Sequence, residues 1–188
     1  MPDLFDSPAS PLAFLLAGKS KKPALTFLSG SPGAGKSTWC LELAEAARAS
    51  GLVVGGLISP AVLVDGRKTG IDLVNLASGE CRRLAVRRGE AEEGFRTARW
   101  VLDPGVLAWG NQQLQALPPG DILILDELGP LEMEQGRGLA AGLALIEKRQ
   151  MPRIVAVVRP ALLPIARQRW PWGRTLMLNR AQAESGRG

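Results

Sequence analysis

The sequence contains neither histidine nor tyrosine among its 188 residues. These absences exclude histidine general bases, Ser-His-Asp triads, HExxH zinc sites and tyrosine acids. Catalysis would therefore have to use carboxylates, lysine, arginine, hydroxyls, backbone amides, a metal ion or a bound cofactor. The two cysteines, Cys40 and Cys81, lack CxxC spacing, and we expect both to be reduced thiols packed within the fold.

Long apolar segments are also missing. The run over residues 11–18 is too short to span a bilayer, and acidic Asp3 and Asp6 precede it where a signal peptide would carry basic residues. A cytoplasmic protein without a membrane span is the default expectation. Apolar residues make up 46% and charged residues 22% of the chain, a balance typical of one globular domain.

The net charge is +5, and the basic residues behind it are spread along the chain. The densest runs, over residues 19–22 and 82–88, are expected to be solvated surface. No RRM, helix-turn-helix or zinc-finger pattern occurs, and no aromatic residues interleave with the basic runs. The sequence therefore indicates no nucleic-acid partner.

Composition divides the chain into three parts. Residues 1–23, rich in Pro, Ser and Lys, are expected to be a leader outside the main fold, available to a protein partner. Residues 24–179 are expected to form the domain, and residues 180–188 a C-terminal tail. Apolar runs predict strands at 24–29, 52–58, 61–65, 70–77, 81–86, 95–102, 121–126, 153–158 and 175–178, and helical patterns at 37–49, 104–117, 135–150 and 160–169. Their order predicts a three-layer α/β fold with a mostly parallel sheet and an antiparallel hairpin section.

A phosphate-binding loop is the strongest motif. Gly30-Ser31-Pro32-Gly33-Ala34-Gly35-Lys36-Ser37 matches GxxxxGK[ST] in full, between a predicted strand and a predicted helix. Its glycines let successive N–H groups turn inward, and the helix start adds positive partial charge. Lys36 can reach the β- and γ-phosphates, and the Ser37 hydroxyl can bind Mg²⁺.

A second motif, Ile122-Leu123-Ile124-Leu125-Asp126-Glu127, is a buried strand ending in two carboxylates, the Walker B pattern. It predicts that Asp126 holds Mg²⁺, through a water molecule. Glu127 is then placed to orient or deprotonate the attacking water, which suits a chain without histidine.

Other polar residues give weaker signals. Arg159 follows the strand at 153–158, so we expect it to project toward the same sheet edge and to stabilise γ-phosphate charge. Glu132 could belong to the site, but a charge at a helix start explains it equally well. Arg67 and Arg96 are candidates for the substrate pocket.

The tryptophans are assigned to packing rather than to base stacking. Trp39, Trp100 and Trp109 are expected in the core, and Trp170-Pro171-Trp172 in a turn that caps the surface. No Asn-Lys-x-Asp sequence occurs, so strict GTP selectivity is not indicated.

Two further segments carry a family resemblance. Asp126-Glu127-Leu128-Gly129-Pro130-Leu131-Glu132 and Gly66-Arg67-Lys68-Thr69-Gly70-Ile71-Asp72-Leu73, with Gly79 downstream, resemble the cancer-related nucleoside-triphosphatase family and its thermophilic prokaryotic relatives. The similarity covers residues 24–179. It implies a P-loop fold related to RecA-like ATPases and Mg²⁺-dependent hydrolysis of ATP, GTP, CTP and UTP to diphosphates. It also implies phosphate binding by the whole of residues 30–38, Thr38 included, with Asp126 and Glu127 serving the metal and the water.

The sequence departs from the family in one place. The family's Gly-Phe-x-Thr-x-Glu-Val-Arg-like stretch reads here Gly56-Leu57-Ile58-Ser59-Pro60-Ala61-Val62-Leu63, without the Glu and the Arg. This difference predicts slow turnover or another physiological substrate. The leading hypothesis is a nucleoside triphosphatase. The alternatives are a P-loop kinase with residues 82–99 as its lid, and a nucleotide-dependent switch that uses residues 1–23 to engage a partner.

Overall fold

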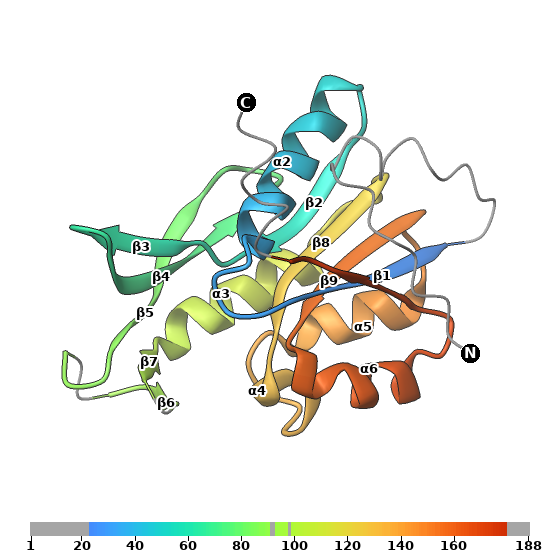
Figure 1. Cartoon of the computed structure of the whole chain (residues 1–188). Helices are drawn as coiled ribbons and strands as arrows, with labels where there is room; N and C mark the ends of the chain where they lie inside the picture. Colours follow the sequence, from blue (N-terminus) through green and yellow to red (C-terminus); the bar gives the residue numbers. More distant parts are fainter. Residues whose placement is uncertain (1–22, 91–92, 98, 180–188) are drawn as a thin grey trace.

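One mixed β-sheet forms the centre of the molecule (Figure 1). The computed structural model describes residues 23–90, 93–97 and 99–179. Within this part, ten strands are joined in the order β10-β1-β9-β8-β2-β4-β5-β7-β6, with β3 paired to β4. The strands are β1 Ala24–Ser29, β2 Val54–Ile58, β3 Ala61–Val64, β4 Arg67–Asn75, β5 Cys81–Arg87, β6 Phe95–Arg96, β7 Trp100–Leu102, β8 Ile122–Leu128, β9 Arg153–Val158 and β10 Arg174–Met177.

The parallel half of the sheet consists of β10, β1, β9, β8 and β2. Its inner strands are almost fully buried, as expected for parallel strands covered on both faces. β9 lies between β1 and β8, so one strand separates the two strands that carry the nucleotide motifs. Both motifs therefore end at the same edge of the sheet.

Helices cover the two faces of this parallel half. α2 (Lys36–Ala49) packs on one face against side chains that include Ile122 and Ile124 of β8. On the other face, α3 (Pro104–Gln115), α4 (Pro130–Met133), α5 (Ala140–Lys148) and α6 (Leu163–Arg169) pack with Leu123 and Leu125 of the same strand. This alternation produces the three α/β/α layers that the sequence predicted.

The antiparallel half continues the sheet on the β2 side, where α3 packs against β4 and β5 (Figure 1). The end of β4 pairs with β2, with Val74 opposite Ile58. Residues 67–71 of β4 pair with β3, and residues 70–74 pair with β5. Because β4 runs antiparallel to β2, its first residues lie beyond the carboxyl end of β2. The first half of β4 therefore reaches the same sheet edge as the phosphate loop. Register shifts at Val62/Leu63 and at Ile71/Asp72 bend this hairpin.

Two predicted elements were wrong in detail. The single strand expected over residues 95–102 is a hairpin of β6 and β7, whose turn is closed by the Thr97 hydroxyl accepting from the Trp100 N–H at 3.1 Å. The helix expected over residues 135–150 begins only at Ala140, because Gly136 and Gly138 adopt positive φ angles of 62° and 66°. The leader and the C-terminal tail lie outside the described residues, apart from Pro23.

Two expectations about packing were also wrong. Cys81 is exposed at the start of β5, whereas Cys40 is buried in α2 as expected. Trp170, expected in a surface turn, is 3% exposed and packs in the core, its ring centroid 6.3 Å from that of Phe27. None of the described helices is both long enough and apolar enough to cross a bilayer.

Candidate active site at the carboxyl ends of the parallel strands

The phosphate loop connects β1 to α2 in the conformation that its glycines allow. Gly33 and Gly35 have φ angles of 77° and 83°, in the left-handed region that favours glycine. Gly35 is the N-cap of α2, and it has no side chain to bond the first N–H groups of the helix. Those N–H groups and the positive end of the helix dipole are therefore available to an anion.

The Lys36 side chain folds back over this loop. Its Nζ donates to the carbonyl oxygens of Gly30, at 2.9 Å, and Ser31, at 3.0 Å. The base of the loop is anchored by the buried Ser29 hydroxyl, which donates to the carbonyl of Val158 at 2.7 Å. The ammonium group thus lies within the loop, and the ends of β1 and β9 are bonded together.

Asp126 of β8 contacts the side chain of Ser37 in the first turn of α2. It is 4% exposed, and the Ser37 hydroxyl donates to its carboxylate. The Ser59 N–H donates to Asp126 Oδ2 at 3.4 Å, and the Ser59 hydroxyl donates to the Asp126 carbonyl at 2.5 Å. Burial raises the pKa of Asp126 from 3.8 to about 6, the Ser37 hydrogen bond lowers it, and the Glu127 charge raises it.

The donors at this point suit a magnesium ion. A serine hydroxyl and a carboxylate are hard oxygen ligands, and Mg²⁺ in nucleotide sites takes its other ligands from phosphate and water oxygens. The described part of the chain contains no cluster of three or more His, Cys, Asp or Glu residues that could enclose a metal. Ser37 and Asp126 thus fit a metal that arrives with a nucleotide better than a permanently bound one.

Glu127 and Arg159 form an ion pair at the same edge. Glu127 is near the end of β8 and Arg159 directly follows the neighbouring strand β9. Arg159 does project toward this edge, as the sequence predicted, but its guanidinium bonds Glu127. The Glu127 side chain is 28% exposed and that of Arg159 is 59% exposed, so both groups are open to solvent and to a ligand.

The weaker candidates fall outside this arrangement. Glu132 is a helix-start charge in α4, but it is buried and accepts from the N–H groups of Gly129 at 2.9 Å and Leu139 at 2.8 Å. It orders the segment after β8 rather than facing the phosphate loop. Arg67 and Arg96 are exposed, on β4 and β6.

Lys68, next to Arg67, is a residue that the sequence did not identify. Its side chain is half-buried, and its Nζ lies 5.1 Å from the centre of the Trp100 ring. Burial lowers the pKa of Lys68, the charges of Glu127 and Asp126 raise it, and Arg159 lowers it. Lys68 is therefore within electrostatic reach of both carboxylates, although about sixty residues separate them in the chain. Only its place within the family-like segment 66–73 gave any signal.

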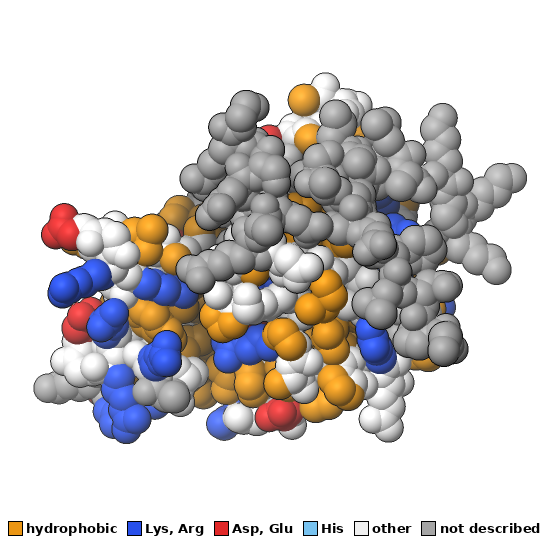
Figure 2. Space-filling model, in the orientation of Figure 1, with side chains coloured by type: hydrophobic (Ala, Val, Ile, Leu, Met, Phe, Trp, Pro, Cys, Tyr) orange, Lys and Arg blue, Asp and Glu red, His pale blue; other side chains and the backbone are white. Residues whose placement is uncertain are grey.

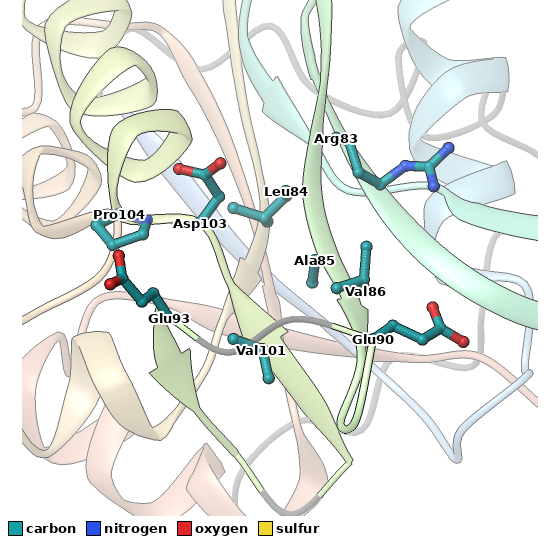
Figure 3. A pocket seen from close by; sticks show the side chains of 9 residues that line it. All are labelled: Arg83, Leu84, Ala85, Val86, Glu90, Glu93, Val101, Asp103 and Pro104. Atoms are coloured by element: carbon teal, nitrogen blue, oxygen red, sulfur yellow. The ribbon is translucent and has the colours of Figure 1, made fainter.

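A cavity of about 450 Å³ lies elsewhere, between β5, β7 and the start of α3 (Figure 3). Its charged lining is mostly acidic: Glu90, Glu93 and Asp103 against Arg83. Asp103 caps α3 by accepting from the N–H groups of Gly105 and Val106, and Arg83 pairs with Asp72 at 2.6 Å. Such a lining does not suit a phosphate, so the phosphate loop remains the candidate site.

The site's residues fall within a match to a known family. The model of the NTPase family matches residues 25–168, which include the phosphate loop, both carboxylates and Arg159. The chain belongs to the NTPase family. Membership of this family confirms the enzyme class expected from the sequence, a nucleoside triphosphatase.

Archaeal members of this family are similar in sequence. Nucleoside-triphosphatase THEP1 of Pyrococcus abyssi is 32% identical over 152 residues, which cover 77% of this chain and 81% of the relative. THEP1 of Pyrobaculum aerophilum is 34% identical over 146 residues, 75% and 77% of the two chains. For THEP1 of Methanopyrus kandleri, 33% identity over 113 residues covers 60% of this chain and 61% of the relative.

Two solved structures share the fold. The solution structure of a human cancer-related nucleoside triphosphatase has a TM-score of 0.61 and 21% identity, covering 85% of this chain and 89% of the human one. The crystal structure of THEP1 from Aquifex aeolicus has a TM-score of 0.56 and 15% identity, with coverages of 85% and 92%. These likenesses confirm the expected P-loop NTPase fold.

Proposed function

We propose that this chain is a Mg²⁺-dependent phosphohydrolase that converts nucleoside triphosphates to diphosphates with loose base preference. The contact between Ser37 and Asp126 carries the proposal, because it brings a hydroxyl of the phosphate loop and a buried Walker B carboxylate to one point. The names of the archaeal relatives, nucleoside-triphosphatase THEP1, support the same activity.

Binding would rest on the loop formed by residues 30–38. The N–H groups at the start of α2 would surround the β-phosphate, and Lys36 would exchange its bonds to Gly30 and Ser31 for bonds to the β- and γ-phosphates. Ser37 and Asp126 would hold Mg²⁺. When bound, this ion supplies positive charge to the phosphate oxygens and fixes their orientation.

Hydrolysis would be assisted by Glu127. A water molecule attacks the γ-phosphorus while Glu127 accepts one of its protons. The bond from the γ-phosphorus to the β–γ bridging oxygen breaks, and nucleoside diphosphate and inorganic phosphate leave. Arg159 would act as a positioning residue, because its ion pair restricts the Glu127 carboxylate.

Loose base preference is inferred from the site's composition. The residues assigned above would act on phosphate, metal or water, with Arg159 acting through Glu127, and none is assigned to the base. The sequence also has no Asn-Lys-x-Asp segment to read guanine. Phosphate release from ATP, GTP, CTP and UTP tests this, with Mg²⁺ and with excess EDTA, against Lys36→Ala as control. Comparable rates for the four nucleotides are expected, all lost with EDTA. Turnover equal to that of Lys36→Ala would overturn the hydrolase, and strong selection of one base would overturn the loose preference.

Slow turnover is expected because of the segment that departs from the family. Ala61 and Leu63 occupy the positions of the family's Glu and Arg, and Leu63 is 62% exposed on β3. These apolar side chains cannot bond substrate or water. The segment expected as a kinase lid, residues 82–99, instead contains most of β5 and all of β6 among its described residues, and β7 follows it directly, so nothing in the fold favours a kinase.

A further inference from the structure

The hairpin of β3 and β4 brings a cation toward the two Walker B carboxylates. Lys68 is the second residue of β4, in the half of the strand that extends beyond the carboxyl end of β2. The Arg87 guanidinium, from β5, donates to the Lys68 carbonyl at 3.0 Å and fixes this part of the strand. The backbone from which Lys68 projects is thus held from both sides, by β3 and by β5.

The ammonium of Lys68 is positioned by an aromatic ring rather than by a carboxylate among the described residues. It lies over the Trp100 ring at 5.1 Å, a distance at which the ring face attracts a cation. No ion pair within 4.0 Å joins Lys68 to any described acidic residue, although Glu127 and Asp126 both act on its charge. A half-buried cation that interacts with two carboxylate charges, and that forms no ion pair with a described residue, is available to bind an anionic ligand.

Two other cations of this edge, Lys36 and Arg159, are already bonded. Lys36 is bonded to carbonyl groups of the phosphate loop, and Arg159 is paired with Glu127. Figure 2 shows that Lys and Arg side chains also gather on the side of the molecule formed by the antiparallel strands. Lys68 adds to these cations a charge that interacts with the charges of both Asp126 and Glu127.

We propose that Lys68 is a further catalytic residue, which contacts the γ-phosphate of the bound triphosphate, and that Trp100 is the positioning residue for its ammonium. Lys68 approaches the phosphate from the hairpin, opposite to Lys36 in the phosphate loop. It stabilises negative charge on the γ-phosphoryl oxygens as the bond to the bridging oxygen breaks. This inference rests on the proposed nucleoside triphosphatase activity.

The test compares Lys68→Met and Lys68→Arg with Arg88→Met, which removes one charge from an exposed position of the same antiparallel section. Lys68→Met is expected to lower kcat about 10²-fold, the effect of losing one positioned donor. Lys68→Arg is expected to restore most of this loss, and Arg88→Met to leave kcat within about 3-fold of the parent chain. Equal kcat for Lys68→Met and Arg88→Met would overturn the inference.

A binding measurement separates this inference from the proposed function. The affinity for a non-hydrolysable triphosphate analogue should fall about 10-fold or more in Lys68→Met, while the affinity for the diphosphate changes less than about 3-fold. If the parent chain releases no phosphate, the hydrolase proposal fails, yet this selective loss would still place Lys68 at the γ-phosphate. Equal losses for both nucleotides would overturn that placement.

Trp100 is tested in the same way. Trp100→Leu should lower kcat about 3- to 10-fold in the parent chain but have little further effect in Lys68→Met, because a positioning residue acts only through its partner. Independent effects of the two substitutions would show that Trp100 does not act through Lys68. The thermal midpoint of each variant controls for a loss of folding.

Discussion

The Arg159 guanidinium forms an ion pair with the Glu127 carboxylate across the carboxyl ends of β9 and β8. The two residues that sequence reasoning assigned to separate tasks, phosphate charge and water activation, therefore contact each other. Because both side chains are partly exposed, the pair adds little to the stability of the fold. Its consequence is the orientation of Glu127 at the sheet edge.

Glu127→Gln should retain binding of Mg²⁺ and nucleotide but reduce hydrolysis about 10²-fold or more, because glutamine cannot accept the proton of the attacking water. Binding of a non-hydrolysable analogue and single-turnover phosphate release measure the two quantities separately. Unchanged turnover would remove Glu127 from the mechanism.

Arg159→Ala should lower kcat about 10-fold in the parent chain and less than about 2-fold in the Glu127→Gln chain, since a residue that acts through Glu127 has no effect once Glu127 is inactive. Steady-state kinetics of the two single variants and the double variant give this comparison. If the fold reductions in kcat of the two single variants multiply in the double variant, Arg159 contacts the phosphate directly. That is the role that the sequence alone suggested.

Asp126→Asn should stabilise the chain at alkaline pH when EDTA removes divalent metal. Burial raises the pKa of Asp126 from 3.8 to about 6, so the folded state holds its proton more tightly than the unfolded state. The ionised carboxylate therefore destabilises the fold fully above pH 6, progressively less as the pH falls toward 3.8, and not at all below 3.8. The gain from Asp126→Asn is at most about 3 kcal/mol at pH 8.

Urea unfolding at pH 4, 6 and 8 measures this difference. The two chains should be nearly equal at pH 4 and diverge as the pH rises. A stability difference independent of pH would mean that the Asp126 carboxyl has an ordinary pKa in the folded state. Added Mg²⁺ and nucleotide should favour the parent chain, because Asp126 would then carry a bonded charge.

The sequence predicted those parts of the site that lie within one local pattern. The loop over residues 30–37 and the strand ending at Asp126 each combine apolar residues and functional side chains in one continuous segment, so their structure follows from local rules. The residues in contact across the sheet could not be predicted in this way. The Ser59 bonds to Asp126 and the approach of Lys68 to Glu127 depend on strand order and on the bends of the β3–β4 hairpin.

The errors in the fold have the same origin. The two short strands of the β6–β7 hairpin have the composition of one strand, and the bonds between Thr97 and Trp100 that close the turn leave no pattern in the sequence. Trp170 follows a short helix in a segment that looks like a surface turn, yet it fills space beside Phe27, from the other end of the chain. Long-range packing of this kind leaves no periodic pattern in the sequence.

The two cysteines should differ in reactivity toward a disulfide reagent. Cys81 is exposed, whereas Cys40 is completely buried in α2, and burial raises the pKa of its thiol well above the ordinary value. At pH 8 one thiol should react in the native chain and the second at least about 10²-fold more slowly, at the rate at which the fold opens. Cys81→Ser should abolish the fast phase. A fast phase that persists in Cys81→Ser would contradict the burial of Cys40.

Glu132 should be important for stability rather than for hydrolysis. Its carboxylate accepts two backbone N–H groups, from Gly129 and Leu139, and both bonds are buried. Glu132→Ala leaves both donors without a partner, which costs about 2–4 kcal/mol, whereas Glu132→Gln keeps one oxygen acceptor and should lose roughly half as much. The exposed Glu134 provides the matched control, since Glu134→Ala should change stability by less than about 0.5 kcal/mol. Urea unfolding ranks the three variants. A Glu132→Ala chain as stable as Glu134→Ala would show that solvent replaces the two bonds, and that the segment between β8 and α5 does not depend on this buried carboxylate.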